Sequence, residues 1–165
     1  MKVQYVNSIL SAVKHVFLSM LDLPVKFKNP IIKDTRHPTH ALSSIVSLTG
    51  HLNGWIVISY PIDIAKKVAS ELLGGCLDAV DAELIDALCE IANMVTGVAD
   101  TALEIENLTY SLPSVANIGD KIVYPTDCFV FSMSCILDAG EFEVDIALLE
   151  PGVEEIIHET KNTDS

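Results

Sequence analysis

Basic residues are scarce in this chain, which has 10 Lys and Arg against 23 Asp and Glu among 165 residues. The formal net charge of −13 weighs against nucleic-acid binding, because such binding depends on basic side chains that neutralise phosphates. The same charge disfavours anionic membrane surfaces. No basic residue at all lies between Val68 and Asp120. We therefore expect neither a nucleic-acid partner nor a membrane partner.

Long apolar runs are also missing. No stretch of ~18 apolar residues without a charge occurs, so no membrane-spanning helix is expected. The N-terminal segment starts with a basic residue, but polar residues interrupt any signal-peptide core and no small-residue cleavage site follows. We interpret this segment as an amphipathic helix and expect a cytoplasmic location.

The chain has few cysteines and histidines, and they do not form a known pattern. The four cysteines show no C-x-x-C spacing, and the favoured interpretation is that they are buried free thiols: Cys76, Cys89, Cys128 and Cys135. Asp34, His37 and His40 could share a metal ion. Because the segment that carries them contains a proline and is typical of a turn, a solvated loop is favoured over a metal site.

What the sequence does contain is a clear alternation of secondary-structure signals. Apolar residues at helical spacing predict helices over residues ~3–21 and ~81–103, and Pro61 and Gly74 delimit a third helix between them. Apolar and β-branched runs predict the strands, which are 25–34, 41–50, 52–61, 108–113, 121–125, 128–137 and 141–150. Parallel β–α–β alternation is missing, so we predict an α+β domain with long helices on a mostly antiparallel sheet.

We expect a single domain over residues 1–151, followed by a polar tail over 152–165. The last two predicted strands form a long apolar hairpin, whose edge must be covered or paired. This edge is a first indication of a dimer.

Five residues, three of them acidic, share one side of the predicted helix over ~81–103. They are Asp86, Glu90, Asn93, Gly97 and Asp100, and they fall within roughly 80° of one another. The opposite side is apolar and should be buried: Leu84, Leu88, Ile91, Val95, Val98 and Ala102. The five residues, called the stripe below, should therefore be exposed on a rigid helix. Gly97 costs about 1 kcal/mol relative to Ala there, which close approach of a partner's backbone would offset.

The stripe matches a family signature. The chain resembles the CheC/CheX family of chemotaxis phosphatases, and the CheX branch most closely. The family's helix pattern is Asp or Ser, three residues, Glu, two residues, Asn, and it corresponds to Asp86, Glu90 and Asn93. Pro113 in "SLPSVANIG" matches the family's downstream proline. The similarity spans roughly residues 3–149, whereas the stripe's spacing alone would also suit an ordinary acidic solvent face.

The resemblance implies a CheC-like fold with a pseudo-twofold internal repeat, in which the first and last helices are counterparts. On the first helix, the equivalent register from Ser8 gives Ala12 and His15 instead of a Glu and an Asn. One active site per subunit is therefore implied. The resemblance also implies a homodimer that pairs through sheet edges.

The implied substrate is the phospho-aspartyl form of a CheY-like response regulator. Asn93 would position the attacking water, because an amide adds no negative charge beside the phosphoryl group. Glu90 would pair with the receiver's lysine, and Asp86, Gly97 and Pro113 would contact the receiver. The receiver would supply Mg²⁺, so we expect no metal or cofactor of the chain's own.

Two other interpretations stay open at this stage. The chain could be a non-catalytic binding module, since flagellar switch proteins share this type of fold. It could also be a dimer that sequesters a phosphorylated regulator without turnover. Retention of both Glu90 and Asn93 favours the phosphatase.

Overall fold

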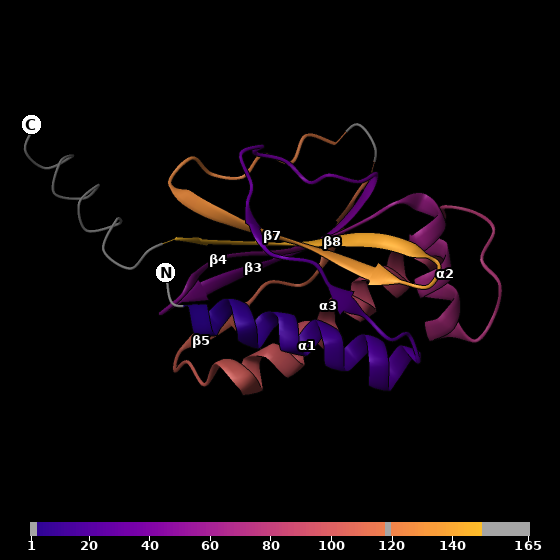
Figure 1. Cartoon of the computed structure of the whole chain (residues 1–165), viewed down its shortest axis with the longest axis horizontal. Coiled ribbons are helices and arrows are strands. Elements are labelled where there is room, and N and C mark those ends of the chain that lie inside the picture. Colours follow the sequence, from indigo (N-terminus) through magenta and orange to yellow (C-terminus); the bar gives the residue numbers. More distant parts are fainter. Residues whose placement is uncertain (1–2, 118–119, 150–165) are drawn as a thin grey trace, which may run out of the picture.

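The computed structural model describes residues 3–117 and 120–149. The described residues form helices packed against one face of an eight-stranded sheet (Figure 1). The elements are α1 (Val3–Leu21), β1 (Lys26–Phe27), β2 (Ile31–Ile32), β3 (Leu42–Gly50), β4 (Asn53–Tyr60), α2 (Ile62–Leu73), α3 (Ala82–Leu103), β5 (Leu108–Tyr110), β6 (Ser114–Ala116), β7 (Cys128–Leu137) and β8 (Gly140–Leu149). The expected domain end at residue 151 and the expected tail over 152–165 lie outside the described residues.

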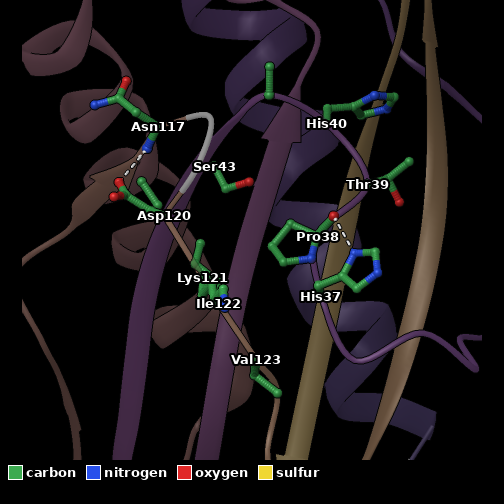
Figure 2. Close-up of a pocket in the computed structure, with 12 residues that line it drawn as sticks. His37, Pro38, Thr39, His40, Ser43, Asn117, Asp120, Lys121, Ile122 and Val123 are labelled. Carbon is green, nitrogen blue, oxygen red and sulfur yellow. Dashed lines mark hydrogen bonds between the residues drawn. The ribbon is translucent and has the colours of Figure 1, made fainter.

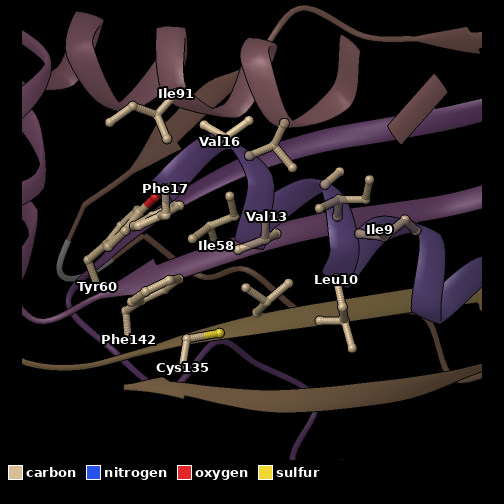
Figure 3. Close-up of a cluster of buried hydrophobic side chains, with 14 of the residues drawn as sticks. Ile9, Leu10, Val13, Val16, Phe17, Ile58, Tyr60, Ile91, Cys135 and Phe142 are labelled. Atoms are coloured by element: carbon tan, nitrogen blue, oxygen red, sulfur yellow. The ribbon is translucent and has the colours of Figure 1, made fainter. Parts of the chain in front are cut away.

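The helices form where the apolar spacing predicts them. α1 buries a complete face, and Figure 3 shows its side chains against the sheet and α3. At the centre, Phe17 stacks on Phe142 with ring centroids 4.6 Å apart, and the ring centroid of Tyr60 lies 5.6 Å from that of Phe142. Burying aromatic groups of this size supplies much of the core's stability. α1 and α3 lie side by side on this core (Figure 1).

The sheet is built from two similar halves whose strands cross over. Each half has a helix, two short strands and a hairpin, and the two hairpins meet where β4 pairs with β8. The short strands β1 and β2 pair with β7 of the second half, whereas β5 and β6 pair with β3 of the first. All described pairings are antiparallel. The predicted α+β class with an internal repeat is confirmed.

Several predicted strands differ from the observed ones. The run over 25–34 is broken near Pro30 into β1 and β2, since proline gives no hydrogen to a strand ladder. Residues 121–125 form no strand, because Tyr124 is buried and Ile122 half-buried against the sheet, and the Tyr124 amide donates to the Arg36 carbonyl instead. β6 was not predicted at all. The β7–β8 hairpin has no free edge among the described residues, because β4 pairs with one side of it and β1 and β2 with the other.

Residues 33–41 and 120–127 lie over the sheet face opposite the helices (Figure 1). Lys33 anchors the first of these segments: its Nζ lies 2.8 Å from the Asp145 carboxylate and 2.5 Å from that of Glu143. Tyr124 in the second segment donates a 2.7 Å hydrogen bond to Asp145. The predicted loop over Asp34–His40 is confirmed and is largely exposed, although Lys33 and Arg36 tie it to the sheet.

Two further expectations concern burial and the membrane. Cys128 and Cys135 are buried free thiols as expected, but Cys76 is exposed and Cys89 is half-buried. Cys76 follows the glycines that end α2, in an exposed stretch between α2 and α3. In the part of the chain that the structure describes, no helix has the length and apolar character to cross a membrane.

Candidate functional site

Capping fixes both ends of α3. The Asp81 carboxylate accepts a 3.1 Å hydrogen bond from the Leu84 amide, which satisfies one of the open donors of the first turn. Glu104 ends the helix in a left-handed conformation, and its amide bonds to the Asp100 carbonyl. Between these caps the helix is held against the core along one side. It is a rigid support for side chains on its other side.

The buried line of α3 differs slightly from the predicted one. Leu84, Leu88, Ile91 and Val95 are buried as expected, but Val98 is half-buried and Ala102 is exposed. In the second half of the helix the buried residues advance four at a time through Val95, Ala99 and Leu103. Because a helical turn takes 3.6 residues, this line rotates around the helix and leaves Val98 and Ala102 outside it.

The whole stripe is exposed on α3, as predicted: Asp86, Glu90, Asn93, Gly97 and Asp100. Within the described residues, the side chains of Glu90 and Asn93 make no hydrogen bond and no ion pair. They stand one turn apart, about 4.5 Å along the helix axis. Both side chains are therefore available to a partner at no cost to contacts inside the chain.

The connection between β5 and β6 lines one edge of the stripe. The Tyr110 hydroxyl donates a 3.1 Å hydrogen bond to Asp100, and the Cys89 thiol lies 3.7 Å from the Pro113 carbonyl. Pro113 therefore lies next to the stripe, directly beside the turn that carries Glu90. Burial, together with the negative charge of Asp86, raises the pKa of the Cys89 thiol. A thiol that stays protonated is a poor nucleophile, so Cys89 is not a candidate catalytic group.

No steric constraint within the chain requires a glycine at position 97. A Cβ placed there would meet no atom within 4 Å, and the residue lies inside the helix, where Ala would be more stable. The open space lies outside the molecule, on the stripe. This geometry is what close approach of another backbone would require.

Sequence reasoning missed Leu112. Its side chain is 87% exposed beside Pro113, between the two attachments of the β5–β6 connection to α3. The only signal in the sequence is that this leucine precedes a proline. A residue before proline favours an extended backbone and does not continue a helix. That signal predicts backbone shape but not exposure.

The structure offers little that could hold a metal. Among residues 3–117 and 120–149, no group of three or more His, Cys, Asp or Glu side chains is arranged for a metal ion. His37 and His40 instead line a cavity of about 500 Å³ on the opposite face of the sheet from α3 (Figure 2). The His37 ring nitrogen lies 3.0 Å from the Pro38 carbonyl. Burial lowers the pKa of His40 below its ordinary value.

The comparison with known families identifies the family of the chain. A family model described as chemotaxis phosphatase CheX matches residues 42–134, more than half of the chain and the whole of α3. The chain belongs to the CheX family. The predicted membership of a phosphatase family is confirmed.

Relatives agree with this assignment. CheY-P phosphatase CheX of Thermotoga maritima is 26% identical over 109 residues, which cover 66% of this chain and 69% of that protein. The solved CheX of Desulfovibrio desulfuricans superposes with a TM-score of 0.79 at 26% identity, covering 87% of this chain and 98% of the other. CheX in the CheX–CheY–BeF₃–Mg²⁺ complex from Borrelia burgdorferi shares the fold, with a TM-score of 0.78, 24% identity, and coverage of 90% and 100%.

Proposed function

We propose that this protein hydrolyses the aspartyl phosphate of a CheY-type response regulator in the cytoplasm. The observation that carries the proposal is that Glu90 and Asn93 lie one turn apart on a rigid helix. Both side chains are exposed, and neither has a hydrogen-bond or ion-pair partner among the described residues. Membership of the CheX family and the solved complex of a fold relative with CheY support the same substrate.

The reaction needs a positioned water more than a strong catalytic group. The water oxygen forms a new bond to phosphorus while the bond between phosphorus and the aspartate oxygen breaks. The aspartate leaves as a carboxylate, and the proton of the water passes to the departing phosphate or the solvent. Asn93 holds the water in line by a hydrogen bond from or to its amide. Positioning and electrostatics account for most of the catalysis in phosphoryl transfer.

Glu90 has a different task in this mechanism. A carboxylate in the place of Asn93 would repel the phosphoryl oxygens, but one turn away it can face the conserved lysine of a receiver domain. The charge-assisted contact orients the receiver on α3. The receiver supplies Mg²⁺, and this chain supplies no cofactor of its own.

The remaining stripe residues would contact the receiver. Asp86 lies one turn before Glu90 and extends the acidic surface, whereas Gly97 leaves room for the receiver's backbone. Pro113 lines the edge of the site and shapes it through its contact with Cys89.

Asn93→Ala is the direct test. Because Asn93 is exposed and unpaired, its loss should change the free energy of unfolding by no more than ~0.5 kcal/mol. Dephosphorylation should nevertheless fall about a hundredfold or more, since the water loses its positioning group. Asn93→Asp should be no faster. The measurement is phosphate release from a phosphorylated receiver at substoichiometric protein.

Glu90→Ala is the matched comparison. It should weaken receiver binding by on the order of 2 kcal/mol, so a higher receiver concentration should recover part of the rate. Wild-type turnover by Asn93→Ala would contradict the mechanism. Binding of the phosphorylated receiver by the wild type without phosphate release would instead support a binding module or a sequestering dimer.

We also propose a homodimer that pairs through a sheet edge. The described sheet ends at short strands, and Ile31 and Ile32 on β2 are 59% and 58% exposed at one of these edges. Exposed apolar residues on an edge strand favour pairing with a second copy. Light scattering at micromolar concentration should give the dimer mass, and Ile31→Lys should shift it toward the monomer. A monomer in the wild type would contradict the proposal.

A further inference from the structure

Leu112 differs from the other exposed apolar side chains in where it lies. Single exposed leucines are common on protein surfaces, so an exposure of 87% alone indicates nothing. Val123, at 69% exposed, lies on the other face of the sheet. Leu112 projects from the connection that lines the stripe.

The backbone on both sides of Leu112 is firmly held. Ser111 donates a 2.9 Å hydrogen bond from its amide to the Ser47 carbonyl, and its hydroxyl accepts another of 2.9 Å from the Ser47 amide. Tyr110 before it and Pro113 after it contact α3. A side chain on a fixed backbone loses less conformational freedom when a partner buries it, so more of the contact energy remains as affinity.

The contacts of Tyr110 and Pro113 with α3 place Leu112 alongside the helical turn that carries Glu90 and Asn93. Asp100 and Cys89, which hold Tyr110 and Pro113, lie about 16 Å apart along the axis of α3. They occupy the same edge of the stripe, about 20° apart around the helix. Leu112 therefore lies beside the length of α3 that carries Glu90, Asn93 and Gly97.

We propose that Leu112 is the apolar anchor that seats the phosphorylated receiver domain on α3. The inference rests on the proposed phosphatase function and adds the contact that sets affinity for the substrate. Charge selects the occupant: the stripe carries three acids and one amide beside the exposed Leu112, and neither α3 nor the β5–β6 connection contains a basic residue. This surface fits a receiver that presents an apolar depression bordered by basic residues, and buried apolar anchors inside a polar border dominate such interfaces.

The experiment separates affinity from turnover. The CheY-type receiver of the same organism is phosphorylated with acetyl phosphate, and steady-state dephosphorylation is measured for the wild type and for Leu112→Ser. KM should rise about tenfold, the effect of losing one interface anchor, while kcat stays within about twofold. Leu112→Met keeps an apolar side chain of similar volume and should restore most of the affinity.

Val123→Ser removes an exposed apolar group from the opposite face and should leave both constants unchanged. A wild type without turnover would reject the proposed function and this inference with it. A wild type with normal turnover, together with an unchanged KM in Leu112→Ser, would reject only the inference. A loss confined to kcat would also reject it, because the residue would then position the reaction instead of the receiver.

Discussion

At the scale of single residues, the candidate site is made of side chains that the fold does not need. The exposed side chains of Glu90 and Asn93 make no hydrogen bond or ion pair within the described residues, so they add little to the stability of the fold. Gly97 lowers the stability of the fold, because glycine inside a helix is less favourable than alanine. A residue kept against its cost in stability indicates a function.

Gly97→Ala tests this directly. The new methyl group meets no atom of the chain, and Ala is the better helix former, so the free energy of unfolding should rise by about 0.5–1 kcal/mol. KM for the phosphorylated receiver should also rise about fivefold, equivalent to about 1 kcal/mol, since the methyl group occupies the partner's space. Urea unfolding and steady-state kinetics measure the two effects.

Ala102→Gly is the control on the same helix. It should lower stability without changing KM, because Ala102 is exposed away from the stripe. A Gly97→Ala protein that is more stable and binds the receiver normally would show that no backbone approaches this position.

At the scale of elements, a buried lysine helps to hold the segment over residues 33–41 on the sheet. Lys33 is shared by two carboxylates beneath it and is only 7% exposed. Burial alone would raise the pKa of both acids. The hydrogen bonds and charge of Lys33, with a hydrogen bond from Thr39, keep the pKa of Glu143 below its ordinary value, while that of Asp145 stays above its own.

Lys33→Met should therefore cost about 3–5 kcal/mol of unfolding free energy, the loss typical of leaving buried charges without a counter-ion. Lys28→Met is the matched control, because its 2.7 Å ion pair with Glu141 is about half exposed and contributes at most ~1 kcal/mol. Urea midpoints of the two variants give the comparison. Equal losses would mean that the buried ion pair adds nothing beyond a surface one.

The same elements show what could be predicted from the sequence. Helical periodicity locates α1 and α3, and apolar runs rich in β-branched residues locate the two hairpins, whose central strands are buried on both faces. The sequence pattern fails over residues 121–125, where Ile122 and Tyr124 alternate like a strand but belong to a segment that lies on the sheet. It also misses β6, whose three residues pair with β3 without a distinctive pattern. The position of Leu112 in space depends on these long-range contacts, so the neighbouring residues in the sequence could not predict it.

At the scale of the whole molecule, the crossed strands make the two halves dependent on each other. The hairpin of the first half has β5 and β6 on one side and β8 on the other, and all three come from the second half. The order of the sheet could not be read from the residues, and only the family resemblance indicated the repeat.

Cleaving the chain between Gly75 and Cys76 should show this dependence. These residues are exposed between α2 and α3, so the cut itself breaks no packing. Neither fragment alone should show a cooperative thermal transition by circular dichroism, whereas an equimolar mixture should regain one. A cooperative transition in the first fragment by itself would contradict the interlocked arrangement.

The crossed strands also set an order of events during synthesis on the ribosome. β4 emerges well before β8, its partner at the centre of the sheet, and at ~5–20 residues per second the interval is on the order of ten seconds. Throughout that interval the nascent first half exposes the apolar face of α1 and an open strand. The protein therefore completes its sheet only after β8 has been made, and its first half is the part that needs protection by chaperones.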